Sequence, residues 1–247
     1  MRRRWIADEV DLTSGRAALT GDHALHLARV LRAAPGQEFD IVTKVDDRAV
    51  VRLGRISSVT EQRVEFELGE QVQASTIVAP VTLLLAVFKF DRMEWAIEKA
   101  VELGVERVVP VIVRRTEKHL AVAADKRTER WRRIAHEAAQ QSRRNSPPEI
   151  SNPLKLEAAI QSAQGVGVVL AEAERMRSLK EILEQIPQGS PLTLAVGPEG
   201  GWTADEVKQF SDAGWHSASL GPTILRAETA AIAALAVVMA MVSIPQN

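Results

Sequence analysis

The chain has 247 residues, a formal net charge of −1 at pH 7, 46% hydrophobic residues, 26% charged residues and no cysteine. These values exclude a disordered or fibrous chain, a disulfide framework, a thiolate zinc site and a cysteine nucleophile. A near-neutral net charge also argues against a protein that coats nucleic acid electrostatically, so only local basic clusters could contact phosphates.

The longest apolar run, residues 230–242, is too short to span a bilayer and is expected to be a buried helix. The five histidines are scattered without the spacing of a metal site, so we expect no metal and no membrane contact. The absence of cysteine fits a reducing compartment, and we expect a cytoplasmic protein.

The first seventy residues have β character. Apolar and polar residues alternate in segments 38–45, 48–59 and 63–72, which predicts a small barrel or curled sheet. One helix is expected over residues 20–36, with Thr20 or Asp22 as its N-cap and Pro35 and Gly36 as its stop. Weak periodicity up to Pro80 then predicts a domain boundary between residues 73 and 74.

The rest of the chain alternates strand-like and helical segments. Residues 81–88 form a continuous apolar run, and an amphipathic helix follows over residues 91–104, with Gly104 at its C-cap. Further strands are predicted at 107–113, 166–173, 191–196 and 215–220, and helices at 125–144, 178–186, 203–214 and the C-terminus. Capping boxes at Ser178 with Glu181 and at Thr203 with Glu206 support this register. The alternation predicts an α/β domain with a parallel sheet covered on both faces.

Two glycine- and proline-containing loops precede the last two helices, GPEGG at residues 197–201 and LGPTILRAE at residues 220–228. In an open parallel sheet such loops lie at the carboxyl ends of strands, where ligands bind. Neither a P-loop nor a Rossmann glycine motif is present, and Glu199 would repel a phosphate. The loops therefore predict main-chain contacts to a ligand that is not a pyrophosphate; the alternative is that they are only tight turns.

The segments GPEGGWTADEV and LGPTILRAETA resemble the two signature loops of the SPOUT-class RNA methyltransferases, and more narrowly of the 16S ribosomal RNA uracil-N3 methyltransferases. Residues 26–36, 88–105 and 137–150 resemble three further motifs of that family in the same order, so the likeness covers nearly the whole chain. Two departures lie in the N-terminal part: Leu25-His26 stands in place of paired histidines, and Trp5-Ile6 in place of an aromatic pair.

The resemblance implies a PUA-like RNA-binding β-barrel domain at residues 1–73 and a SPOUT methyltransferase domain at residues 74–247, whose C-terminal part forms a deep trefoil knot. It implies a homodimer that uses S-adenosylmethionine to methylate N3 of one uridine in small-subunit 16S rRNA, giving 3-methyluridine. Two alternatives stay open. One is a SPOUT methyltransferase for another rRNA or tRNA base, and the other is a non-catalytic RNA-binding factor in ribosome assembly.

By position in the family motifs, the expected cofactor-binding residues are Leu170, Ala171, Glu172, Gly197, Pro198, Glu199, Gly200, Gly201, Ser219, Leu220, Gly221, Ile224, Leu225 and Thr229. Arg226 is expected to stabilise negative charge on O2 or O4 of the uracil, because its guanidinium stays charged; the alternative is a salt bridge with Glu228. Glu199 and Glu228 are the candidate bases, and Glu228 could instead cap the last helix. The expected RNA contacts are Arg2, Arg4, His26, Arg29, Arg32, Arg143 and Arg144.

Overall fold

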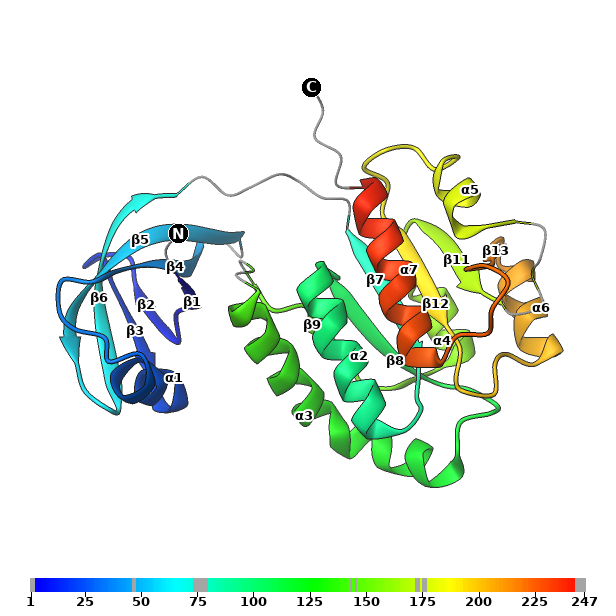
Figure 1. Ribbon diagram of the computed structural model, residues 1–247, viewed down its shortest axis with the longest axis horizontal. Helices are drawn as coiled ribbons and strands as arrows, with labels where there is room; N and C mark the ends of the chain where they lie inside the picture. Colours follow the sequence, from blue (N-terminus) through cyan, green and yellow to red (C-terminus); the bar gives the residue numbers. More distant parts are fainter. Residues whose placement is uncertain are drawn as a thin grey trace. The chain divides into compact units, whose positions relative to one another are not determined.

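The computed structural model describes residues 3–45, 48–72, 80–142, 144, 146–171, 174 and 177–242. The chain divides into two compact units (Figure 1). The first contains Met1–Ser75 and Ala139–Ser146, and the second contains Thr76–Ala138 and Pro147–Asn247. The boundary expected between residues 73 and 74 lies outside the described residues.

The first unit is built on a six-stranded sheet in the order β1-β4-β5-β6-β3-β2. Its strands are β1 Arg4–Ile6, β2 Glu9–Asp11, β3 Arg16–Thr20, β4 Glu38–Val45, β5 Arg48–Val59 and β6 Arg63–Gln71. Only β1 and β4 pair in parallel, and the β5–β6 register shifts twice, which bends the sheet. Gly54 is required in β5 because a Cβ there would lie 2.3 Å from Ile41 Cγ1 in the buried core.

The helix expected over residues 20–36 is shorter than the sequence predicted. Helix α1 spans Gly21–Leu25 and continues as a π-helical turn, η1, over His26–Val30. Thr20 is at the N-cap position, but its side chain makes no capping hydrogen bond. The helix ends before Pro35 because Arg32 adopts a left-handed conformation, with φ of 49°.

The second unit contains a seven-stranded sheet of parallel pairs in the order β10-β8-β7-β12-β11-β13, with β9 beside β8. Its strands are β7 Val81–Ala86, β8 Arg107–Ile112, β9 Glu149–Ile150, β10 Leu154–Lys155, β11 Val166–Leu170, β12 Leu192–Val196 and β13 His216–Ala218. Five of the six residues of β7, the predicted apolar run, are buried, and so is every residue of β12. The expected α/β class with a parallel sheet is confirmed.

Helices cover both faces of this sheet (Figure 1). They are α2 Phe90–Leu103, α3 Lys118–Gln141, α4 Leu156–Gln161, α5 Leu179–Leu183, α6 Ala204–Asp212 and α7 Ala227–Val242. Helices α4 and α6 share one core with the sheet, and α2 packs along α7. In the described part of the chain, no helix is long and apolar enough to cross a membrane.

The predicted helix ends are partly confirmed. Both capping boxes are formed, at Ser178 in α5 and Thr203 in α6, and Gly104 caps α2 with φ of 108°. Helix α3 begins seven residues before the expected start at residue 125, since residues 118–124 continue the apolar periodicity with Leu120 and Ala124 buried. The short β10–α4 segment was not predicted.

Candidate functional site

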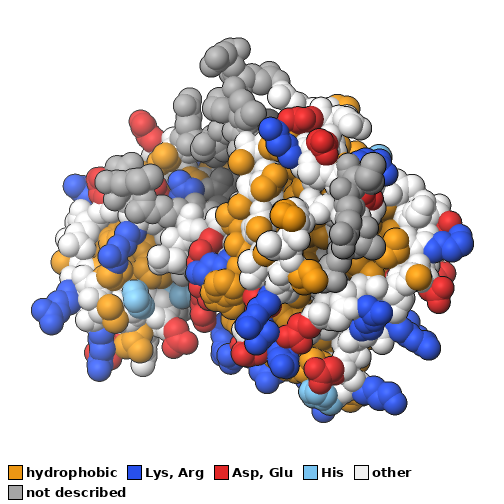
Figure 2. Space-filling model, turned by 45° about the vertical axis from the view of Figure 1, so that its right-hand side comes forward, with side chains coloured by type: hydrophobic (Ala, Val, Ile, Leu, Met, Phe, Trp, Pro, Cys, Tyr) orange, Lys and Arg blue, Asp and Glu red, His pale blue; other side chains and the backbone are white. Residues whose placement is uncertain are grey.

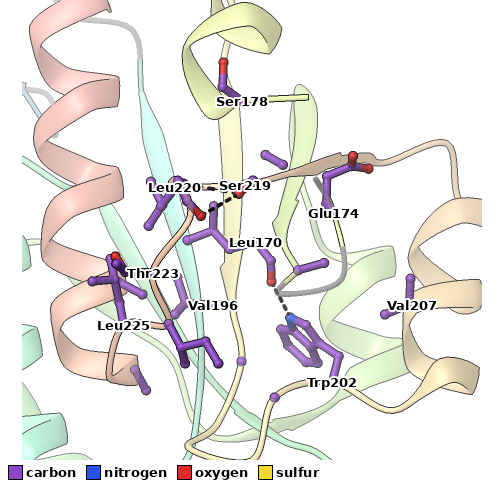
Figure 3. Close-up of a pocket in the computed structure, with 18 of the residues that line it drawn as sticks. Leu170, Glu174, Ser178, Val196, Trp202, Val207, Ser219, Leu220, Thr223 and Leu225 are labelled. Carbon is purple, nitrogen blue, oxygen red and sulfur yellow. Dashed lines mark hydrogen bonds between the residues drawn. The ribbon is translucent and has the colours of Figure 1, made fainter. Parts of the chain in front are cut away.

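A cavity of about 870 Å³ lies in the second unit, enclosed by the loops that follow three neighbouring parallel strands, β12, β11 and β13 (Figure 3). Each loop leaves a carboxyl end of the sheet, the position at which open α/β sheets bind ligands. Ten residues predicted for cofactor binding line this cavity: Leu170, Ala171, Gly197, Pro198, Gly201, Ser219, Leu220, Gly221, Ile224 and Leu225.

Three other described residues of the predicted cofactor set, Glu199, Gly200 and Thr229, do not line it. Glu199 and Gly200 belong to the loop at residues 197–201 but are not among the residues that line the cavity. Thr229 is exposed on α7, and Glu172 lies outside the described residues. The structure therefore brings together the three predicted loops and separates Glu199 and Thr229 from the cavity itself.

Trp202 forms one wall, although the sequence analysis did not single it out. Its indole Nε1 donates a 2.9 Å hydrogen bond to the Leu170 carbonyl, which links the loop after β12 to the end of β11 (Figure 3). Its ring packs edge-to-face on Phe210 at a centroid distance of 5.0 Å. A Cβ at Gly197 would lie 3.1 Å from Nε1, so glycine allows the close approach. The tryptophan that directly follows GPEGG was the available sequence signal.

Arg115, from the loop after β8, lines the cavity and also holds the loop at residues 197–202. Its guanidinium donates to the Gly200 carbonyl and, at 3.4 Å, to the Trp202 carbonyl. The base of the same loop is held by Glu206, which is 5% exposed. This carboxylate accepts hydrogen bonds from the Thr203 N–H at 2.8 Å and the Arg114 N–H at 2.7 Å. The loop conformation is therefore fixed by side chains from two other segments.

The conformation of the loop after β13 is set by hydrogen bonds of Ser219. Its hydroxyl donates to the Gly221 carbonyl at 3.2 Å and accepts the Gly221 N–H at 3.1 Å. Gly221 has φ of 125°, which favours glycine. Beyond this turn, Ile224 lines the cavity although its side chain is 81% exposed. An open apolar edge of this kind suits a ligand with an apolar portion.

The two candidate bases, Glu199 and Glu228, share one ion-pair partner. Arg92, in the first turn of α2, places Nη1 3.0 Å from Glu199 Oε1 and 3.6 Å from Glu228 Oε1. Glu228 is buried in the first turn of α7, where the helix dipole favours a negative charge, and its Oε2 has no hydrogen-bond partner among the described residues. Neither carboxylate lines the cavity.

Arg226 is exposed, between the cavity-lining residues Leu225 and Ala227. The salt bridge with Glu228 considered as its alternative role does not form, because Glu228 pairs with Arg92. Among the described residues, no carboxylate lies within ion-pair distance of Arg226. Its guanidinium therefore stays available to a negatively charged ligand group.

Two side chains that carry opposite charge also line the cavity beside the start of α5: Arg177 and Glu181. Glu181 accepts hydrogen bonds from the N–H and hydroxyl of Ser178, and these lower the pKa of its carboxyl.

In the part of the chain that the structure describes, no group of three or more His, Asp or Glu side chains could hold a metal ion.

The predicted RNA contacts that are described all belong to the first unit: Arg4, His26, Arg29, Arg32 and Arg144. Arg29 pairs with Glu61 at 2.8 Å, and that hydrogen bond raises the pKa of its guanidinium. Arg4 Nη2 lies 3.7 Å from Asp40 Oδ2. The centroids of the His26 and Trp5 rings are 5.8 Å apart. Arg2 and Arg143 lie outside the described residues.

Comparison with known proteins decides the family. Residues 76–239 match the RNA methyltransferase domain family. The ribosomal RNA small subunit methyltransferase E of Mycobacterium tuberculosis is 33% identical to the chain, over 97% of the chain and 92% of that relative. The chain belongs to the ribosomal RNA small subunit methyltransferase E family. The Bacillus subtilis member is 30% identical over 90% of the chain and 88% of its own length.

A solved family structure agrees with this assignment. The ribosomal RNA small subunit methyltransferase E of Neisseria gonorrhoeae, bound to S-adenosyl methionine, superposes with a TM-score of 0.80 at 28% identity. The match covers 96% of both chains. The family resemblance carried by the two signature loops is therefore confirmed.

Proposed function

We propose that the protein transfers a methyl group from S-adenosylmethionine to N3 of one uridine in 16S rRNA of the small ribosomal subunit, giving 3-methyluridine. The observation that carries the proposal is the cavity at the ends of β11, β12 and β13, whose loops and apolar side chains are joined by the charged side chains of Arg177 and Glu181. The relatives named as small-subunit rRNA methyltransferases and the S-adenosyl methionine in the Neisseria structure support it.

The residues of the cavity fit S-adenosylmethionine. Its volume of about 870 Å³ is within the roughly 300–1,000 Å³ of small-molecule sites. Loop main chain and the apolar side chains of Leu220 and Leu225 suit an adenosine group, and Arg177 and Glu181 suit the carboxylate and ammonium of a methionine group. When bound, this cofactor supplies a methyl group on a positively charged sulfur.

Arg226 is the residue that we assign to the uracil. A guanidinium next to O2 or O4 stabilises the negative charge that develops when N3 loses its proton, and so lowers the pKa of N3. The proton can then pass to water, and Glu199 and Glu228 are the side-chain acceptors that the sequence suggested. Positioning contributes an effective molarity of about 10⁵ to 10⁸ M, against about 10² to 10⁴ for a general base. Holding the two substrates therefore matters more than the identity of the base.

We assign RNA binding to the first unit as a PUA-like domain at residues 1–73, and catalysis to a SPOUT domain at residues 74–247. The basic side chains predicted for RNA, Arg4, Arg29, Arg32 and Arg144 together with Arg2 and Arg143, would contact phosphates, with His26 beside them. The target uridine must leave its stack before N3 can be reached. An enzyme with this substrate works in the cytoplasm.

A homodimer is part of the proposal, because α7 is apolar around its whole circumference. In a single chain Ala236 and Ala240 are exposed and Ile232 and Val237 are only half-buried, and Figure 2 shows hydrophobic side chains gathered on the displayed face of this unit. An all-apolar helix is normally covered on every side. A second copy would supply that cover and bring two sites to the interface.

We further propose that the C-terminal part of the chain is threaded as a deep trefoil knot. The support lies in the path of the chain, since β13 adds to the edge of the sheet beside β11 and α7 then returns to pack on α2 and β12. A return across the strand ends would also bring the three cavity loops together.

The test uses purified protein, S-adenosylmethionine and small ribosomal subunits from cells that lack 3-methyluridine in 16S rRNA. Nucleoside mass spectrometry should find about one 3-methyluridine per 16S rRNA. Methyl transfer to another nucleoside or to transfer RNA would favour a sister enzyme. Loss of cofactor binding in calorimetry would instead point to a non-catalytic assembly factor.

A further inference from the structure

Arg92 joins three segments that are distant in the sequence. Its guanidinium pairs with Glu199 in the 197–202 loop, at 3.0 Å, and with Glu228 at the start of α7, at 3.6 Å. Arg92 itself lies in the first turn of α2, where a helix dipole opposes a positive charge. The two carboxylates offset the unfavourable interaction of the Arg92 cation with the helix dipole, and Arg92 in turn neutralises their negative charge.

Burial makes the three charges dependent on one another. The side chain of Glu228 is 8% exposed, whereas those of Arg92 and Glu199 are 32% and 33% exposed. Arg92 is the only ion-pair partner of Glu228 among the described residues. A buried carboxylate that loses its cation keeps the full cost of desolvation, so α7 and the loop would both shift.

The side chain of Glu199 is directed to Arg92 and does not line the cavity, while its neighbours Pro198 and Gly201 do. Arg115 holds the same loop through the carbonyls of Gly200 and Trp202. Two arginines thus hold the loop: Arg92 through the side chain of Glu199, and the cavity-lining Arg115 through main-chain carbonyls.

We propose that Arg92 is a positioning residue that fixes the 197–202 loop and the N-terminus of α7 in their cofactor-binding conformation, and that Glu199 is its counter-charge. The inference rests on the proposed function only in requiring that the cavity binds S-adenosylmethionine. The position that is methylated on RNA does not enter it.

The test is a double-mutant cycle with Arg92→Met and Glu199→Gln in the full-length protein, with Arg92→Lys as the conservative variant. S-adenosylmethionine affinity is measured by calorimetry without RNA, and hydrogen exchange of the 197–202 amides is measured without cofactor. Each single variant should weaken cofactor binding roughly 10- to 100-fold and speed exchange of the loop. The double variant should be no weaker than Arg92→Met alone, because the two residues act through one contact. Arg92→Lys should recover part of the loss.

Arg107→Met is the matched control, since Arg107 is a partly exposed arginine of the same unit that pairs with Glu149 at 3.3 Å. It should leave cofactor affinity and loop exchange unchanged. Because Arg92→Met could unfold the chain, Glu199→Gln and Arg92→Lys also have to show the affinity and exchange effects by themselves.

Two results would overturn the inference. One is additive losses in the cycle. The other is a Glu199→Gln variant that keeps its cofactor affinity and loop exchange but loses turnover at saturating cofactor, since Glu199 would then act on the substrate. If the cycle gives the expected result but the wild-type protein makes no 3-methyluridine, only the proposed function is rejected.

Discussion

The indole N–H of Trp202 donates a 2.9 Å hydrogen bond to the carbonyl of Leu170, so one side chain links the loops that follow β12 and β11. Replacing Trp202 with Phe keeps an aromatic wall but leaves this carbonyl without its donor. We expect a loss of about 1 kcal/mol in cofactor binding, or about fivefold in affinity by calorimetry. Trp95→Phe is the control, because Trp95 is 46% exposed on α2 and should bind cofactor normally. Equal effects of the two substitutions would contradict the role of the hydrogen bond.

Gly197 and Gly200 differ in what an added methyl group would meet. At Gly197 the nearest atoms belong to the packed indole of Trp202, at 3.1 and 3.2 Å, whereas at Gly200 the nearest atom is Cδ of the exposed Arg115 side chain, at 3.2 Å. The indole is packed on Phe210 and bonded to Leu170, so it cannot give way, whereas Cδ of the exposed Arg115 can shift by a few tenths of an ångström while the guanidinium keeps its hydrogen bonds. Gly197→Ala should therefore lower cofactor affinity at least tenfold, and Gly200→Ala by less than threefold. A larger effect at Gly200 would reverse the argument.

The sequence predicted the sheet and the two glycine- and proline-containing loops from local patterns, whereas the loop after β11 was expected only from the family resemblance. The buried run of β12, the capping boxes at Ser178 and Thr203, and the Gly104 cap are all read from neighbouring residues. The π-helical end of the helix at His26–Val30 was not predictable in this way, since it depends on where the segment packs against the sheet.

The roles of the acidic residues likewise depend on tertiary contacts that neighbouring residues in the sequence do not predict. Glu199 and Glu228 are 29 residues apart in the sequence, but their pairing with one guanidinium depends on Arg92, more than 100 residues earlier. No local pattern indicates such a contact. Trp202 was missed for the same reason, because its partner Leu170 lies in another loop.

Glu206 is the buried link between the 197–202 loop and the loop after β8. Its two carboxylate oxygens accept N–H groups from Arg114 and Thr203, so Glu206→Ala removes a helix cap and leaves the Arg114 N–H without this acceptor. We expect a loss of roughly 2–3 kcal/mol in the free energy of unfolding, measured with urea. Ser178→Ala, which removes the exposed capping box of α5, should cost only about 1 kcal/mol. Similar losses would show that burial of Glu206 adds nothing to capping.

The capping box of α5 also predicts a dependence on pH. Hydrogen bonds from Ser178 lower the pKa of Glu181 below its ordinary value of 4.5. A carboxyl with a lowered pKa in the folded state contributes stability above the unfolded pKa and loses it as the pH falls through the folded pKa. Urea titrations should thus show that Glu181→Gln reduces stability at pH 7 and reduces the fall in stability below pH 4.5. An unchanged slope in the acid range would contradict the pKa shift.

Arg226 offers the sharpest separation between binding and chemistry. Arg226 is exposed, stands in the sequence between two cavity-lining residues and has no ion-pair partner among the residues that the structure describes, so removing its side chain should not disturb the fold or the cofactor loops. Arg226→Ala should lower the rate of methyl transfer about 10²- to 10³-fold in single-turnover assays at saturating cofactor, the typical loss of one charge-stabilising donor. Cofactor affinity should stay within twofold of wild type. Arg226→Lys should keep part of the rate because it keeps the charge but loses the paired donors. Lys208→Ala, which removes an exposed cation paired with Asp212 on α6, should change neither the rate of methyl transfer nor the cofactor affinity. Near wild-type turnover by Arg226→Ala, or a matching drop in cofactor affinity, would remove Arg226 from the chemical step and leave the charge on the uracil oxygens to another group.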